Sequence, residues 1–166
     1  MDTHIFDIDE AMFQVAAQGD GGLGIFFDVH AACPSVEHIY LLTALEGLGW
    51  PSWVFRIIRA LYHRNHCHLV PRGRRFDGFD MTRGIRQGCP LSPLLFAVTS
   101  HVFMTRLQLL VPRALSRAWA DDVALAVLSY SETLPILAAF FHQLAEVSGL
   151  RLNPSESMLV PLFPPP

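Results

Sequence analysis

Three carboxylates stand where an acidic side chain is unexpected. Asp121 and Asp122 interrupt the apolar run AWADDVALA, and Asp28 ends the apolar run GLGIFFDV. Burying unpaired charges that repel each other costs free energy. If the strands that carry them lay side by side, the three carboxylates would meet at one edge of a sheet. Divalent cations such as Mg²⁺, which prefers oxygen ligands, would relieve the repulsion, and two such ions suit phosphoryl or nucleotidyl transfer.

A simpler interpretation of the Asp121–Asp122 pair is a hairpin turn without chemistry. The two central residues of a tight hairpin lie outside the apolar layer, and Asp tolerates the backbone dihedrals of turns. The catalytic interpretation therefore depends on Asp28 arriving from a separate strand at the same edge.

The elements that would position these residues follow from hydrophobic periodicity. A buried strand is predicted at GLGIFFDV, and two helices follow, one from Val36 with Ser35 as its cap and one from Pro51. HCHLV and FDGFDM form the arms of a basic hairpin, and TRGIRQGCPLSP is a structured loop. A helix from Ser92 to before Pro112, the strands LSRAWA and VALAVLS, and a helix over 132–147 come next. A turn and a strand close the chain. This order predicts an α+β fold, a mostly antiparallel sheet with helices packed mainly on one face.

Composition favours a folded intracellular protein. The chain has 166 residues, of which 51% are hydrophobic and 16% charged, which argues against disorder. Its three cysteines are widely spaced and odd in number, so a reducing compartment is expected. We expect no membrane span, because SPLLFAVTSHVFM, the most apolar run, is interrupted by Ser100 and His101.

The basic residues are unevenly distributed along an otherwise acidic chain. The net charge is −3, and all 12 Lys and Arg residues are arginine. Eight of these arginines lie between Arg56 and Arg86, against two acids, Asp77 and Asp80. Such a basic stripe is compatible with phosphate contacts, and equally with a solvated face.

Four segments resemble reverse transcriptases of the non-LTR retrotransposon and group II intron type. RGIRQGCPLSPLLFAV, from Arg83 to Val98, closely resembles a signature of that family, and WADDVAL resembles its catalytic hairpin. FFDVHAACPSVEHIYLLTALEGLGWPSW and SGLRLNPSESMLV resemble the segments before and after these two. The segments follow the family's order over residues 23–163. The resemblance implies a polymerase-type palm.

The resemblance also implies roles for the carboxylates. Asp28, Asp121 and Asp122 match the catalytic residues, and together with the backbone carbonyl of Val29 they would hold two Mg²⁺ or Mn²⁺ ions. The implied partners are an RNA template, a DNA primer, deoxynucleoside triphosphates and the rest of a retroelement polyprotein.

Further residues match positions near the nucleotide in this family. Gln87 and Gly88 match the loop beside the templating base, where glycine leaves room for close backbone approach. Cys33 stands where the family usually has an aromatic residue that excludes the 2′-hydroxyl. Arg83 and Arg86 would either reach phosphates or brace the loop.

The extent of the resemblance leads to expectations about the whole chain. We divide it into an acidic segment (1–22), a partial palm (23–163) and a Pro-rich tail (164–166). Fingers and thumb are expected to be largely missing, so that the isolated chain has weak activity or none. The location is expected to be intracellular, and nuclear if the host is a eukaryote.

Two other functions are open on the residues alone. One is a non-catalytic nucleic-acid-binding remnant of a decayed retrotransposon, and the other is a metal-dependent phosphohydrolase. His63, His66, Cys67 and His68 are interpreted as solvated rather than as a zinc site, because neighbours along a strand point to opposite faces.

Overall fold

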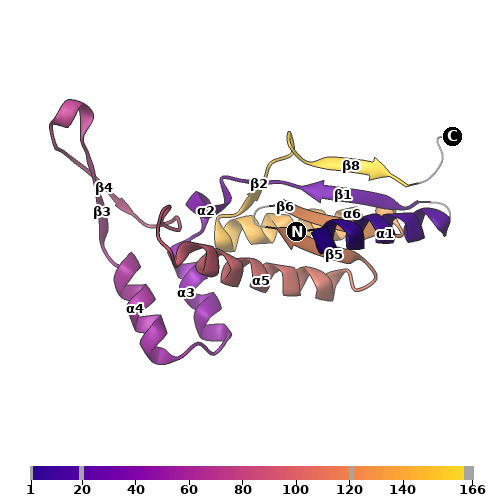
Figure 1. The fold of residues 1–166 in the computed structure, drawn as a ribbon, viewed down its shortest axis with the longest axis horizontal. Helices are drawn as coiled ribbons and strands as arrows, with labels where there is room; N and C mark the ends of the chain where they lie inside the picture. Colours follow the sequence, from indigo (N-terminus) through magenta and orange to yellow (C-terminus); the bar gives the residue numbers. More distant parts are fainter. Residues whose placement is uncertain (1, 19–20, 120–121, 163–166) are drawn as a thin grey trace.

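A four-stranded antiparallel sheet forms the centre of the molecule in the computed structural model, which describes residues 2–18, 21–119 and 122–162 (Figure 1). The strands lie in the order β5-β6-β1-β8. Their bounds are Leu115–Trp119 for β5, Asp122–Val127 for β6, Leu23–Phe27 for β1 and Met158–Pro161 for β8. The central position of β1 explains its composition, because Leu23, Ile25 and Phe27 are all buried.

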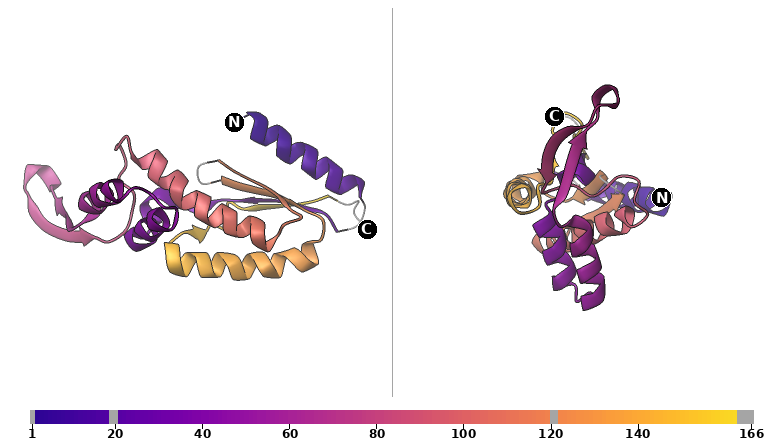
Figure 2. Two further views of the ribbon diagram at one scale, coloured as in Figure 1. Left: turned by 90° about the horizontal axis from the view of Figure 1, so that it is seen from below. Right: turned by 90° about the vertical axis from the view of Figure 1, so that its left-hand side faces the viewer.

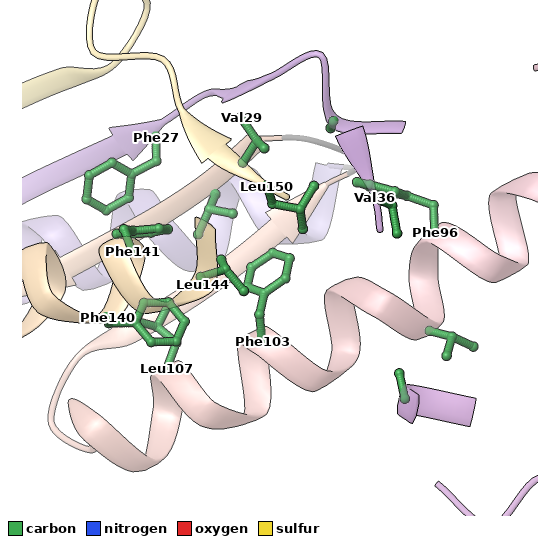
Figure 3. Packing of buried hydrophobic residues seen from close by; sticks show 14 of the residues in the cluster. Phe27, Val29, Val36, Phe96, Phe103, Leu107, Phe140, Phe141, Leu144 and Leu150 are labelled. Atoms are coloured by element: carbon green, nitrogen blue, oxygen red, sulfur yellow. The ribbon is translucent and has the colours of Figure 1, made fainter. Parts of the chain in front are cut away.

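Two long helices, α5 (Ser92–Leu110) and α6 (Tyr130–Ser148), cover one face of this sheet (Figure 2). Between helices and sheet lies the hydrophobic core, where the rings of Phe27 and Phe141 meet edge to face with centroids 4.7 Å apart (Figure 3). Edge-to-face pairs are among the favoured arrangements of aromatic rings. Phe103 and Leu107 of α5 complete this part of the core.

A helix that the sequence analysis did not predict, α1 (Asp2–Ala17), lies over the opposite face of the sheet (Figure 2). Two of its own apolar residues, Ile8 and Val15, are buried. Asp7 of the same helix accepts a hydrogen bond from Arg117 of β5 at 2.9 Å. The acidic segment 1–22 therefore contributes a packed helix rather than a solvated extension. The two longest helices, α5 and α6, lie on the other face, in agreement with the prediction that helices pack mainly on one face.

The segment between β1 and α5 extends away from the sheet (Figure 1). It contains β2 (Val29–His30), α2 (Ala32–Ser35), α3 (His38–Gly47), α4 (Ser52–Tyr62), and the hairpin of β3 (Asn65–Leu69) and β4 (Phe76–Met81), whose tip holds a 3-10 turn at Pro71–Gly73. β2 pairs with β7 (Arg151–Leu152) in a separate two-stranded sheet. α3 is sandwiched between α4 and the pair α5 and α6.

The predicted α+β architecture is confirmed, and one local prediction is wrong. Ser35 does not cap the helix that follows, because it belongs to α2 and α3 begins after Glu37 without a side-chain cap. On the apolar side of α4, Ile58 is fully buried, but Trp53 and Ile57 are more than half exposed. That face of α4 therefore packs only in part against the rest of the chain.

Among the described residues, α5 is long and apolar enough to cross a membrane by length and composition alone. It contributes Leu95, Phe103 and Leu107 to the core between the sheet and α6. A core helix of a folded domain passes the same test, so α5 gives weak evidence for a membrane span.

Candidate active site

The strand register brings Asp28 and Asp122 to the same edge of the sheet. Phe27, the last residue of β1, pairs with Val123 of β6, so the next position on each strand is an aspartate. Asp122 also pairs with Trp119 of β5 and is the first residue of β6. Asp28 is half-buried and Asp122 is exposed. Asp121, the third predicted carboxylate, lies outside the described residues.

A turn near the end of the chain fixes the backbone of Asp28. Its N–H donates to the hydroxyl of Ser157 at 3.3 Å, and its carbonyl accepts from the N–H of Asn153 at 2.9 Å. The Ser157 hydroxyl in turn donates to the carbonyl of Asn153 at 2.8 Å. The two peptide units that flank Asp28 are thereby held, so residues far along the sequence fix the backbone from which the Asp28 side chain projects.

Val29, the predicted backbone ligand, follows Asp28 in β2 and pairs with Leu152 of β7. Its side chain is 5% exposed and belongs to the core. Packing of this side chain and pairing of this strand together hold the chain directly after Asp28. Any metal contact at Val29 would have to use its backbone carbonyl, because the side chain of valine has no ligand atom.

A cavity of about 510 Å³ opens beside the carboxylates. Asp28, Asp122 and Glu156 line it from the sheet and the late turn, while Asp9 and Met12 line it from α1. Carboxylate oxygens at a solvent-accessible cavity are the donor set that Mg²⁺ and Mn²⁺ prefer. Among the described residues, Asp28 and Asp122 supply donors of this kind from the two strand ends, and they are the side chains that would hold such ions.

A second cavity, of about 1190 Å³, adjoins the first at Arg117 and Ala118, which line both. Cys33, Gln87 and Gly88, three of the residues predicted near the nucleotide, line this second cavity. The structure thus brings the RQGCPLSP loop and the segment after Asp28 to one hollow beside the carboxylate edge.

Backbone hydrogen bonds hold the loop in this position. The N–H of Ile85 donates to the carbonyl of Cys33 at 2.8 Å, and the N–H of Gly84 donates to that of Val36 at 2.7 Å. The imidazole of His38, which is 8% exposed, lies 3.0 Å from the carbonyl of Gly84. The loop is therefore fastened to the chain that follows the first carboxylate.

The two arginines of the loop differ in their contacts. The guanidinium of Arg86 donates to the carbonyl of Leu61 at 2.7 Å and to the side chain of Asn65, and it lies over the ring of Tyr62. Arg83 is exposed, and its backbone bridges to Glu37. Of the two alternatives open for Arg86, these contacts favour bracing of the loop against α4. Phosphate binding by Arg83 stays a prediction.

The residues of α1 that line the first cavity were missed from the sequence. The signal was present, because Ile5, Ile8, Met12 and Val15 recur at helical spacing. Asp7, Asp9 and Glu10 lie among these apolar residues and make the segment resemble an acidic, solvent-exposed stretch. His4 and Met12 of this helix face the same cavity as Asp28.

Comparisons with known proteins agree on one family. A family model described as reverse transcriptase (RNA-dependent DNA polymerase) matches residues 4–160. A retrovirus-related Pol polyprotein from the type-1 retrotransposable element R2 of Popillia japonica is 27% identical over 143 residues, which is 80% of this chain and 23% of that protein. The retrotransposable element SLACS 132 kDa protein of Trypanosoma brucei gambiense is 32% identical over 136 residues, 81% of this chain and 11% of that protein. The chain thus spans less than a quarter of the length of these relatives.

Solved structures show the same fold at low sequence identity. The apo telomerase of Candida tropicalis matches with a TM-score of 0.77 and 11% identity, covering 97% of this chain and 32% of that one. The telomerase of Candida albicans, in complex with a fragment of telomeric RNA, matches with a TM-score of 0.71 and 11% identity, covering 96% of this chain and 30% of that one. The predicted palm-type fold is confirmed by these likenesses.

Proposed function

Because the chain belongs to the reverse transcriptase (RNA-dependent DNA polymerase) family, we propose that its carboxylate edge catalyses template-directed nucleotidyl transfer. The substrates would be deoxynucleoside triphosphates, with an RNA template and a DNA primer. The observation that carries the proposal is the register of β1 and β6, which sets Asp28 and Asp122 side by side at the mouth of one cavity.

The role of the aspartates is to hold two divalent ions. When bound, such ions activate the attacking 3′-oxygen and stabilise the charge of the triphosphate and the leaving group. The backbone at Asp28 keeps its position because Ser157 and Asn153 bind the peptide units before and after it. Asp122, the first residue of β6, is exposed and lines the same cavity, so a substrate can reach it. Asp121 is assigned to the same set from the sequence alone.

The nucleotide would occupy the second cavity, beside Gln87, Gly88 and Cys33. Cys33 is half-buried on the wall of this cavity, and its side chain is short. A short side chain near the sugar leaves space for a 2′-hydroxyl. We therefore expect weak discrimination between deoxy- and ribonucleotides, and stronger discrimination after Cys33→Phe. Equal discrimination by both proteins would assign the selection to another residue.

The decisive experiment combines metal binding with primer extension. Purified chain is titrated with Mn²⁺, followed by electron paramagnetic resonance, and is then given a primed RNA template and deoxynucleotides. Asp28→Asn and Asp122→Asn should each weaken Mn²⁺ binding and reduce any extension to background. Glu46→Gln, on an exposed part of α3, is the matched control. Extension that survives both aspartate substitutions would refute the catalytic assignment.

A specific observation also favours the second candidate, nucleic-acid binding without catalysis. Arg72, Arg74 and Arg75 are all exposed at the tip of the β3–β4 hairpin, well away from the sheet. Such cations bind phosphates in a salt-dependent manner. Salt-sensitive RNA binding that Arg74→Gln weakens, in a chain that neither extends a primer nor binds Mn²⁺ at Asp28, would support this alternative.

A further inference from the structure

The β3–β4 hairpin gathers four potential metal ligands on one face. His66 and His68 lie two residues apart on β3, so their side chains point to the same face, and their ring centroids are 4.9 Å apart. Asp80 is the direct cross-strand partner of His66. Asp77 joins them, because its carboxylate lies 2.8 Å from Nε2 of His66.

A β-bulge explains how Asp77 reaches this face. Asp77 and Asp80 are three residues apart, which in a regular strand would place them on opposite faces. Cys67 pairs with Phe79 and Leu69 with Phe76, so between these two pairs β4 has one residue more than β3. Gly78 makes this possible, since a Cβ there would lie 1.8 Å from the carbonyl oxygen of Cys67.

The geometry of the cluster is suited to a single ion. One ligand atom each of His66, His68 and Asp77 lies within 4.8 Å of the other two. Asp80 approaches the other nitrogen of His66, Nδ1, at 2.8 Å. A carboxylate that accepts a hydrogen bond from the second nitrogen of a ligating histidine fixes the ring and strengthens it as a ligand.

The same carboxylates bind the ring of His66. Asp80 and then Asp77 raise the pKa of His66 through hydrogen bonds, and His66 lowers the pKa of Asp77. Both ring nitrogens of His66 lie 2.8 Å from a carboxylate oxygen, Nε2 from Asp77 and Nδ1 from Asp80, so the ring is held from two sides.

We propose that His66, His68 and Asp77 form a binding site for a zinc-type divalent ion, with Asp80 orienting His66. Two imidazoles and one carboxylate are ligands that Zn²⁺ accepts, and water would complete a four-coordinate site. The ion would join the two strands of the hairpin below its arginine-bearing tip. This site is separate from the sheet edge that holds Asp28.

Zinc binding to the full chain tests the proposal. Affinity is measured by competition with a chromophoric chelator, in excess Mg²⁺ so that the oxygen ligands at the sheet edge are occupied. We expect one Zn²⁺ per chain, with binding weakened at least tenfold by His68→Asn and by Asp77→Asn. Asp80→Asn should weaken binding by about 10-fold or more, the usual effect of losing such an outer carboxylate. Co²⁺ should give the visible absorption of a four-coordinate ion.

Two matched variants control for the other ligands nearby. His63→Asn removes an exposed histidine at the end of α4, and Cys67→Ser removes the thiol between the two proposed ligands. Both should leave the Zn²⁺ affinity unchanged, and all variants should keep the wild-type circular dichroism. Undiminished affinity in His68→Asn and Asp77→Asn would overturn the proposal. Loss of the ion in Cys67→Ser would move the site to the opposite face of the strand and would also overturn it.

Discussion

Replacement of Gly149 by alanine should be among the most damaging small changes in the chain. Gly149 ends α6 with a φ of +79°, and its N–H donates to the carbonyl of Ala145. A Cβ at this position would lie 2.2 Å from the carbonyl oxygen of Ser35 and 3.3 Å from Cγ of Glu37. The helix end and the chain leading into α3 are therefore in contact at a point where a methyl group has no room.

The expected loss has two parts. A left-handed backbone costs a residue with a Cβ about 1–2 kcal/mol. The clash must then be relieved by moving the segment of Ser35, and overpacking of this kind costs about 1–3 kcal/mol. That segment is also fixed by the N–H of Glu37, which donates to the carbonyl of Ser148 at 2.8 Å. Gly149→Ala should thus lower the free energy of unfolding by about 2–5 kcal/mol, a large share of the roughly 5–15 kcal/mol typical of a domain.

Gly49 provides the matched comparison. Its φ is +69°, but nothing lies within 4 Å of the Cβ position, so Gly49→Ala should carry the backbone cost alone. Urea unfolding of the two variants, followed by circular dichroism with a common m-value, separates the contact from the backbone cost. Equal losses in the two variants would refute the reasoning, because they would show that the contact between Gly149 and Ser35 contributes nothing.

Three further outcomes are expected. Phe141→Ala should cost about 3–5 kcal/mol of unfolding free energy, because it empties the core beside Phe27, whereas Phe13→Ala, at a residue 76% exposed, should change little; equal effects in denaturation would contradict the placement of the core. Burial raises the pKa of Tyr40 to about 12, so this tyrosine ionises at lower pH in the unfolded chain than in the folded one. The free energy of unfolding should therefore fall as the pH rises from about 10 to 12. Tyr40→Phe should remove that part of the fall in unfolding curves measured across this pH range. Arg86→Ala should release the following loop from α4 and speed its amide hydrogen exchange, without a change in α6; unchanged exchange in the loop would show that the arginine does not brace it.

Elements with strong local patterns were predictable from the sequence. β1 is a short apolar run, and α6 (Tyr130–Ser148) closely matches the helix predicted over 132–147. These features depend on residues close together in the chain, whose spacing is visible directly. That Asp28 follows an apolar run is visible in the same way, whereas the pairing of β1 with β6 is not.

Features that depend on distant residues were not predictable. The hydrogen bond from the N–H of Asp28 to Ser157 joins positions 129 residues apart. The position of α1 on the sheet depends on its packing against β5 and β6 and on the ion pair of Asp7 with Arg117, none of which its own helical spacing shows. Asp77 contacts His66 only because β4 contains a bulge, and the sole sign of that bulge in the sequence is Gly78.

The sheet order has a consequence for how the chain acquires its shape as it is synthesised. Gly24 of the central strand pairs with Ala126 on one side and Val160 on the other, so β1 leaves the ribosome long before either neighbour exists. Closing such long loops is entropically costly, and sheets built from distant segments fold slowly. We expect the amides of β1 to gain protection last in pulse-labelled hydrogen exchange. Protection of β1 before β6 has formed would contradict this order. Until β6 and β8 have formed, β1 is an apolar strand with two unpaired edges, which makes it a target for chaperones and for aggregation. Asp28, which follows β1 directly, should therefore be among the last residues to reach its final position.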